Sequence, residues 1–270
     1  MINLRLAGGL GNQLFQIAAM LLLQKSTGHE ICIYTSELKK YKARRSLELT
    51  KILKLSNVHI EFSHRLPLIL RLRLARLFQM RLLSIQTISD TNFQNIYLSK
   101  FNASHIYADG YFIESINQDI FEDMLNELTN CLKSTLQENV PSDVCIIHIR
   151  GGDFLELGWE LPNIKKFYLD SIKDVLDRKP LIKFEIISDD PPYAHQLISD
   201  LNIKFEFIGK DIVSDFSSLI NAKFAILSNS TFAFWAGAFR TSKDEKPTTW
   251  MPRLWKPGHS RVIKLRTEQW

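Results

Sequence analysis

The sequence predicts an α/β protein with two domains, each built around a parallel sheet. Short apolar runs rich in β-branched residues alternate with longer helical runs along most of the chain, which is typical of strand–helix–strand units. The chain has 270 residues, of which 45% are hydrophobic, and this suits one large domain or two of about 130 residues each. The polar, proline-containing stretch 138–142 is the best boundary, and it places the domains at 1–140 and 141–270.

The first domain opens with a predicted strand, helix and second strand. Ile2–Leu6 is the first strand, an apolar helix covers about Leu14–Ser26, and Gly28 is placed to end that helix. Glu30–Thr35 is the second strand. The other elements predicted before the boundary are a strand over Ser104–Phe112 and a long helix over Glu114–Gln137.

The stretch Arg65–Leu83 mixes leucines with five arginines. At about 100° per residue, Arg71, Arg73, Arg76 and Arg81 are scattered around a helix instead of forming one stripe. The favoured interpretation is a helix whose arginines extend over their surroundings. Contact with anionic lipid head groups stays open as the alternative.

A glycine-rich stretch separates the first strand from the first helix. It is not a dinucleotide fingerprint, because Leu14 stands where a third glycine is needed and no acidic residue closes the second strand. We therefore exclude NAD and FAD as cofactors. With Gly9 and Gly11 shaping a loop, the amides of Asn12 and Gln13 are placed to bond sugar hydroxyls or phosphate. A tight turn capped by Asn12 is the alternative.

Strands and helices also alternate after the boundary. The predicted strands are Val144–Ile149, Phe184–Ser188, Lys204–Ile208 and Phe224–Leu227. Helices are predicted to begin near Ile164, after Pro192, near Ser214 and at Phe232. Polar residues follow three of the strands, at 148–153, 188–190 and 228–231. Because the carboxyl ends of parallel strands lie at one edge of a sheet, these residues are expected to line a ligand site.

Arg150 stands at the tip of the strand Val144–Ile149 and is followed by Gly151, Gly152 and Asp153. A guanidinium there suits a phosphate, because its planar donors match the oxygens and it keeps its charge at any working pH. The two glycines let the backbone approach a ligand closely. A structural ion pair between Arg150 and Asp153 is the alternative interpretation.

The other two polar stretches add anion-binding and acidic groups. Ser228–Thr231 offers hydroxyls, an amide and backbone N–H groups at a helix N-terminus, and with Arg150 it forms a candidate diphosphate cradle. Asp215 suits the N–H edge of a nucleobase, or else it caps the helix 216–222. Asp189 and Asp190 are expected to cap the next helix or to orient an arginine. Since the chain has no D-x-D motif, we predict no metal site.

The composition narrows the possible partners and the cellular compartment of the protein. The formal net charge of +5 suits an anionic substrate or an anionic membrane surface. Nucleic acid is disfavoured as a partner, because the basic residues are dispersed and match no common binding module. Three widely spaced cysteines fit a reducing compartment without disulfides. The chain begins with an apparent strand instead of a leader and has no run of 18 apolar residues, so a soluble cytoplasmic protein is expected.

Four sequence stretches, in this order along the chain, are similar to one known family. They are Gly8–Gln16 (GGLGNQLFQ), His148–Asp153 (HIRGGD), Ser188–Asp190 (SDD) and Ser228–Ala236 (SNSTFAFWA). Together they resemble the bacterial alpha-1,2-fucosyltransferases of glycosyltransferase family 11, and the resemblance runs from residue 1 to the region 250–255. The opening and the S-N-S-T-F element are specific in combination, whereas H-x-R-x-x-D is shared with other fucosyltransferases.

The resemblance implies a GT-B-like fold, with two Rossmann-like domains whose parallel sheets face a cleft. It implies that the first domain serves the acceptor and that the second binds GDP-fucose. The expected reaction is inverting transfer of L-fucose, without a metal or other cofactor, to the 2-hydroxyl of a galactose-terminated glycan in an O-antigen or lipooligosaccharide. A lipid-linked acceptor and peripheral contact with the bacterial inner membrane stay open.

The resemblance also implies roles for individual residues. Arg150 matches the arginine expected to hold the donor β-phosphate and to stabilise the leaving GDP, and Asp153 is a candidate base whose favoured role is to orient Arg150. The other donor-binding positions are His148 and Asp215 towards guanine, Asn229, Ser230 and Thr231 towards the phosphates, and Asn12 from the first domain. The supporting positions are Gly9, Gly11, Gln13, Asp189 and Asp190.

Three features depart from the family pattern. Gly151 replaces the usual second arginine, Phe234 and Gly237 alter a tryptophan–alanine pattern, and Phe224 stands where histidine is common. These departures leave open another GDP-sugar or another linkage. A noncatalytic sugar- or nucleotide-binding protein on the same scaffold is the alternative outside this class.

Overall fold

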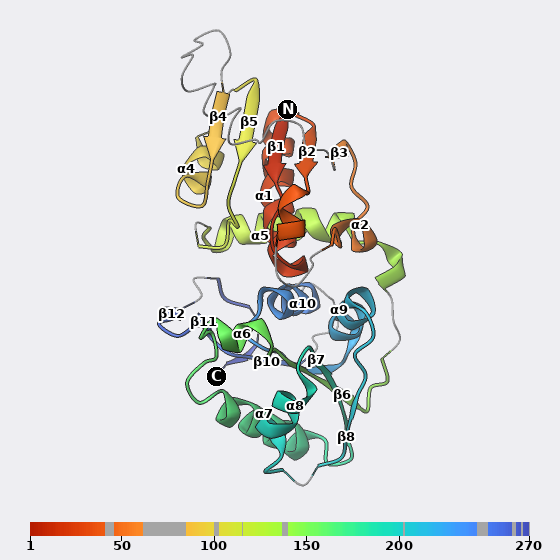
Figure 1. Ribbon diagram of the computed structural model, residues 1–270. Coiled ribbons are helices and arrows are strands. Elements are labelled where there is room, and N and C mark those ends of the chain that lie inside the picture. The colour runs from red at the N-terminus through yellow and green to blue at the C-terminus, as the bar shows by residue number, and fades with distance from the viewer. Residues whose placement is uncertain are drawn as a thin grey trace. The chain divides into compact units, whose positions relative to one another are not determined.

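The computed structural model describes residues 1–40, 46–61, 85–99, 103–114, 116–136, 140–201, 203–241, 248–260, 263–265 and 267–269. The chain forms two compact units, Met1–Lys133 and Ser134–Trp270, whose elements are labelled in Figure 1. The arginine-rich stretch 65–83 lies outside the described residues, so lipid contact there stays a prediction. In the described ranges no helix has the length and apolar character needed to cross a membrane.

The first unit contains a five-stranded sheet in the order β3-β2-β1-β5-β4, and all neighbouring strands in it are parallel. The strands are β1 (Ile2–Arg5), β2 (Ile31–Tyr34), β3 (Val58–Glu61), β4 (Ile85–Ile88) and β5 (His105–Ala108). The predicted strands that became β1, β2 and β5 are confirmed, whereas β3 and β4 were not predicted. The parallel sheet confirms the α/β class for this unit.

The helices of the first unit are α1 (Leu10–Thr27), α2 (Leu49–Ile52), α4 (Phe93–Leu98) and α5 (Gln118–Cys131), with a 3-10 turn at Ser36–Lys40. The long helix α1 packs against β1 and α5. It ends as predicted at Gly28, which adopts a left-handed φ of 70° and donates its N–H to the Gln24 carbonyl. Helix α5 is shorter than predicted, because the Asn117 side chain caps it at its start and Leu132 turns into an extended conformation.

The second unit contains a six-stranded sheet in the order β13-β10-β9-β6-β7-β8, again with parallel neighbours. Its strands are β6 (Val144–Ile149), β7 (Lys183–Ser188), β8 (Phe205–Phe207), β9 (Phe224–Ile226), β10 (Thr248–Met251) and β13 (Glu268–Gln269). A separate antiparallel pair is formed by β11 (Leu254–Lys256) and β12 (His259–Ser260). All six residues of β6 are buried, as expected for a strand covered on both faces.

Helices cover both faces of this second sheet. They are α6 (Asp153–Glu156), α7 (Ile164–Arg178), α8 (Pro191–Ile198), α9 (Ile212–Asn221) and α10 (Thr231–Thr241), and a 3-10 turn lies at Ser134–Leu136. Cys145, Ile147 and Ile149 join one apolar cluster with residues of α7 and α8. Because side chains alternate along a strand, Ile146 and His148 point to the opposite face, where α9 packs against β6 and α10 packs against α9.

A buried arginine joins the helices and the strand β10 on this second face of the sheet. Arg240 in α10 is fully buried, and its guanidinium donates to the carbonyls of Leu219 (2.7 Å) and Thr248 (3.1 Å) and to Thr249 Oγ1 (2.9 Å). Burial lowers its pKa to about 10, so it stays charged at pH 7. It thereby fixes the end of α9 and strand β10 to α10, the helix that follows the tip of β9.

Candidate active site

Three predicted polar stretches meet at the carboxyl edge of the second sheet. Strands β9, β6 and β7 are neighbours, and hydrogen bonds or ion pairs join their tips. His148 Nδ1 lies 2.9 Å from Ser228 Oγ, which links the ends of β6 and β9. Arg150 Nη1 lies 2.5 Å from Asp189 Oδ2, and the Gly151 N–H donates to Asp189 Oδ1 at 2.9 Å, which links β6 to β7.

Arg150 is held between two carboxylates. One guanidinium nitrogen pairs with Asp189, the other donates to Asp153 Oδ1, and the guanidinium carbon lies 5.7 Å from the centre of the Phe154 ring. The side chain of Arg150 is still 21% exposed. The predicted ion pair with Asp153 is therefore present, and the arginine also remains open to a ligand.

The two aspartates after β7 have separate structural roles. Asp190 caps α8, because its Oδ1 accepts from the Tyr193 N–H at 3.1 Å. Asp189 binds Arg150, as described above. The chain therefore uses the pair to cap a helix and orient an arginine. Among the described residues, no group of three or more His, Cys, Asp or Glu side chains is placed to hold a metal ion, and metal independence stays a prediction.

The turn after Arg150 depends on its two glycines. A Cβ added to Gly151 would lie 2.5 Å from Asp190 Cβ, and one added to Gly152 would lie 2.8 Å from Asp189 Oδ2. Gly152 also has a positive φ of 51°, which is strained for other residues. The β6 turn and the tip of β7 thus approach so closely that a side chain between them would displace Asp189 or Asp190.

His148 is a neutral, buried residue at the carboxyl edge of the second sheet. It is 6% exposed, its ring centre lies 5.3 Å from that of Phe232, and its backbone carbonyl accepts from the Tyr168 hydroxyl at 3.0 Å. Burial, and then the nearby charge of Arg150, lower its pKa from 6.5 to about 3. His148 therefore carries no charge at pH 7, and its visible contacts fix the tip of β6 against β9 and α10.

Three of the four residues in Ser228–Thr231 are buried and bonded within the protein. Ser230 Oγ accepts from the Ala233 N–H at 3.1 Å and so caps α10, while Ser228 Oγ donates to Ser230 Oγ at 3.1 Å. Asn229 Nδ2 donates to two carbonyls, those of Trp159 (3.2 Å) and Trp255 (2.7 Å). Thr231, the first residue of α10, is half-exposed, so of these four it is the one that reaches the surface.

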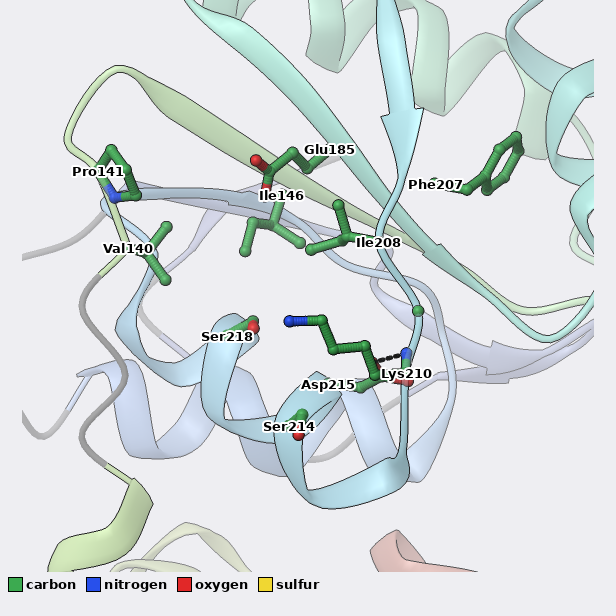
Figure 2. Close-up of a pocket in the computed structure, with 11 residues that line it drawn as sticks. Val140, Pro141, Ile146, Glu185, Phe207, Ile208, Lys210, Ser214, Asp215 and Ser218 are labelled. Carbon is green, nitrogen blue, oxygen red and sulfur yellow. Dashed lines mark hydrogen bonds between the residues drawn. The ribbon is translucent and has the colours of Figure 1, made fainter.

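A pocket of about 500 Å³ lies beside α9 and the end of β8, and Figure 2 shows its walls. Its lining residues are Val140, Pro141, Ile146, Glu185, Phe207, Ile208, Gly209, Lys210, Ser214, Asp215 and Ser218. Asp215 Oδ1 accepts from the Lys210 N–H at 3.0 Å. The alternative that Asp215 caps the helix is wrong, because α9 begins at Ile212 and its cap is Asp211, which accepts from the Val213 N–H at 2.9 Å.

The pocket combines apolar walls with carboxylates, which suits a flat nitrogen base that presents N–H groups. Asp215 on α9 and Glu185 on β7 both line the pocket. Burial, and then the neighbouring charge of Glu206, raise the pKa of Glu185. The pocket adjoins the polar edge, because a Cβ added to Gly209 would lie 4.0 Å from both Asp215 Oδ2 and the Ser188 carbonyl at the tip of β7.

The glycine-rich stretch of the first unit differs from its prediction. Helix α1 begins at Leu10, with Gly9 as its extended cap, so Asn12 and Gln13 lie in the first helical turn and not in a loop. Asn12 is half-exposed. Gln13 is fully buried, and its side chain donates to the carbonyls of Gly8 (3.0 Å) and Ser46 (2.9 Å). The Gln13 amide is therefore used within the protein.

Sequence reasoning missed an aromatic cluster next to Arg150. The rings of Phe154 and Trp159 meet edge to face with centres 5.2 Å apart, and Trp159 is 38% exposed. Lys256 Nζ lies 5.9 Å from the centre of the Trp159 ring. Tyr193 donates its hydroxyl to Glu160 Oε1 at 2.5 Å. A tryptophan in the predicted loop between the strand 144–149 and the helix near Ile164 was the available signal, because its amphipathic ring is enriched at binding surfaces.

Solved structures of similar shape show which fold the chain shares. The chain is similar to the alpha-1,6-fucosyltransferase NodZ soaked with GDP-fucose (TM-score 0.52, 13% identity, 91% of this chain and 96% of that one). It is also similar to POFUT1 in complex with GDP-fucose (TM-score 0.58, 9% identity, 93% and 96%). At these identities the likeness concerns the fold, which is the two-domain α/β fold of GT-B glycosyltransferases.

The sequence comparisons give the family. The model of glycosyl transferase family 11 matches residues 102–246, which is more than half of the chain, and the protein belongs to this glycosyltransferase family. Two relatives from Escherichia coli are each 25% identical to it. They are the O-antigen biosynthesis glycosyltransferase WbnK, with 98% of each chain covered, and an alpha-1,2-colitosyltransferase, with 92% of each covered.

Proposed function

We propose that the protein transfers L-fucose from GDP-fucose to the 2-hydroxyl of a galactoside in a surface glycan, an O-antigen or lipooligosaccharide. The observation that carries this proposal is Arg150, a partly exposed guanidinium at the meeting point of three strand tips, beside a pocket suited to a nucleobase. The family and the names of the two relatives support glycosyl transfer in O-antigen synthesis and an alpha-1,2 linkage.

In this proposal the second unit binds the donor and the first serves the acceptor. The guanine lies in the pocket, where the Asp215 carboxylate accepts from its N–H edge. The diphosphate lies at Arg150 and at the start of α10, near Thr231, and the buried Ser230, Asn229 and His148 keep that edge in shape. Asn12 is the candidate that the first unit contributes to the donor.

The proposed chemistry is a single displacement. The acceptor hydroxyl loses its proton to a general base and attacks the anomeric carbon on the face opposite to GDP, so the configuration inverts. The bond from that carbon to the diphosphate oxygen breaks through an oxocarbenium-like transition state, and GDP leaves with the electron pair. Arg150 stabilises the charge that develops on the leaving oxygen. Asp153 holds Arg150 in place, since one of its oxygens accepts from the guanidinium.

A second candidate differs only in the sugar. One relative that covers 92% of this chain is named an alpha-1,2-colitosyltransferase, and colitose is fucose without its 3-hydroxyl. A site that bonds this hydroxyl would reject colitose strongly, whereas an apolar contact at the same place would not. Comparing the two GDP-sugars as donors separates the candidates.

The test is transfer from GDP-fucose to lactose by the purified chain, with and without EDTA. We expect an alpha-1,2-fucosylated product and GDP release that EDTA leaves unchanged. Arg150→Ala should lower kcat at least about 100-fold, because it removes the leaving-group cation. Arg178→Ala is the matched control: this arginine is also ion-paired, with Asp174, but lies on α7, and activity should persist.

Three other outcomes would change the proposed function or its proposed mechanism. Binding of GDP-fucose without transfer to any galactoside would favour the noncatalytic binding protein. Transfer from GDP-colitose but not from GDP-fucose would establish the second candidate. Loss of activity in EDTA that returns with a divalent ion would contradict the metal-independent reaction.

A further inference from the structure

We propose that Lys256 supplies a second positive charge to the terminal phosphate of the donor diphosphate, and that Trp159 positions its ammonium group. This inference rests on the proposed function, since it requires a nucleoside diphosphate at Arg150. It adds a donor-binding residue from the β11–β12 pair, more than a hundred residues beyond Arg150 in the sequence.

The charges around Arg150 create the need for another cation. Within the ion pairs of the described residues, the Arg150 guanidinium and the two carboxylates of Asp153 and Asp189 carry one positive and two negative charges. A diphosphate brings at least two more negative charges to the same place, and like charges at contact distance repel strongly. The neighbouring residue Gly151 supplies no cation, and any side chain at that position would have to displace Asp190.

Lys256 is linked to Arg150 through two aromatic rings. The Arg150 guanidinium lies over Phe154 at 5.7 Å, Phe154 meets Trp159 at 5.2 Å, and Lys256 Nζ lies over Trp159 at 5.9 Å. The two cations therefore flank one aromatic pair. An ammonium over an indole face is favourably placed by the ring quadrupole, so Trp159 holds the charge of Lys256 against one ring of the pair, while Arg150 lies over the other ring.

The backbone near Lys256 is anchored to the same polar edge. The Asn229 side chain donates to the carbonyls of Trp159 and of Trp255, the residue directly before Lys256. Asn229 itself lies between Ser228 and Ser230, which cap α10 and contact His148. One buried amide thus fixes the positions of Trp159 and Lys256 relative to the start of α10.

The ammonium of Lys256 is available to an anion. Among the residues that the structure describes, no carboxylate forms an ion pair with it, and its contact is the face of Trp159. At a half-exposed site such a contact contributes only about 0.5–1 kcal/mol. The flexible four-carbon stem of lysine lets the ammonium move to a phosphate at little cost, whereas Arg150 is already fixed between two carboxylates.

The test compares binding of GDP and GMP by calorimetry. Lys256→Met should weaken GDP binding roughly 10-fold, the loss expected for one partly screened charge, and should change GMP binding less than about 3-fold. Lys256→Arg should keep GDP affinity near that of the wild type. Lys179→Met is the matched control, because this lysine is also exposed but follows α7 and precedes the amino end of β7.

Each contrary result has a distinct meaning. Unchanged GDP binding in Lys256→Met, with GDP bound by the wild type, would overturn this inference and leave the proposed function intact. Equal losses for GDP and GMP would show that Lys256 acts only on the structure of the edge, which also overturns it. No GDP binding by the wild type would overturn the proposed function and the inference together.

Discussion

The carboxyl ends of the central strands in the two sheets look alike in sequence but are built differently. After β1, the amide of Gln13 is fully buried and bonds to the backbone at Gly8 and Ser46, and Gln16 likewise donates to the Ala7 carbonyl at 2.7 Å. After β6, Arg150 bonds to the side chains of Asp153 and Asp189 and remains partly exposed.

The difference lies in what a ligand could replace. A buried amide that satisfies backbone carbonyls cannot be withdrawn without leaving those carbonyls unpaired, which costs about 1–3 kcal/mol for each group. An arginine paired with partly exposed carboxylates can donate to a phosphate oxygen instead, because the carboxylates can rotate towards solvent and be hydrated there. The first edge is therefore suited to holding a turn in shape, and the second is suited to exchanging partners.

The strongest test of this comparison is Gln13→Leu. The substitution leaves the Gly8 and Ser46 carbonyls and the Glu48 N–H, which donates to Gln13 Oε1 at 3.3 Å, without their partner. We expect the free energy of unfolding to fall by about 3 kcal/mol. Urea unfolding at pH 7 measures this change.

Gln24→Leu is the matched control, since Gln24 lies on the same helix but its one bond, to the Asn57 carbonyl, is exposed. The control should change stability by less than about 0.5 kcal/mol. If Gln13→Leu were as stable as the control, the amide would be free to serve a ligand, and the contrast between the two edges would disappear.

A smaller effect is expected from pH at the second edge. The pKa of His148 is about 3 in the folded protein and about 6.5 when unfolded. Between these two pKa values the unfolded chain binds a proton at this histidine that the folded chain does not bind. The contribution of His148 to stability is therefore fully present above pH 6.5 and is lost as the pH falls towards 3. Between pH 7 and pH 5 this histidine should account for about 2 kcal/mol.

The measurement is urea unfolding of the wild type and His148→Gln at both pH values. The variant should lose about 2 kcal/mol less than the wild type on this change of pH. His195→Gln is the control, because His195 lies exposed on α8. Equal pH dependence in His148→Gln and the wild type would mean that His148 is charged or solvated, and that this edge is looser than its contacts indicate.

Much of the fold could be predicted because its strongest signals are local. The buried strand β6 lies at the predicted residues 144–149, and Gly28 ends α1 as expected. Strands β3 (VHIE), β4 (IQTI) and β13 (EQ) are short and mix in polar residues, so they lack the apolar run that made β2 (ICIY) recognisable. The start of α1 was missed because Gly9 and Gly11 suggested a loop, whereas tertiary packing extends the helix to Leu10.

The site was predictable only where strand order alone brings residues together. The convergence of Arg150, Asp189 and Ser228 follows from parallel strands that happen to be neighbours. The contact of Trp159 with Lys256 depends on a loop and on strand β11, which the Asn229 amide joins by donating to the carbonyls of Trp159 and Trp255. The spacing of these residues in the sequence does not predict that contact. The pocket beside Asp215 likewise depends on how α9 packs against β6.

The smallest effect, and the finest test of the second edge, is expected for Gly151→Ala. The new methyl group would approach Asp190 Cβ to 2.5 Å, so Asp190 must shift and weaken its contact with the Gly152 N–H, now 3.3 Å. Because Asp190 is partly exposed and can move, the loss of stability should be about 1 kcal/mol. Gly209→Ala is the control for stability, since a Cβ there meets its nearest atoms only at 4.0 Å. A loss several-fold larger than this would mean that the edge tolerates no displacement, and the second edge would then be as rigid as the first.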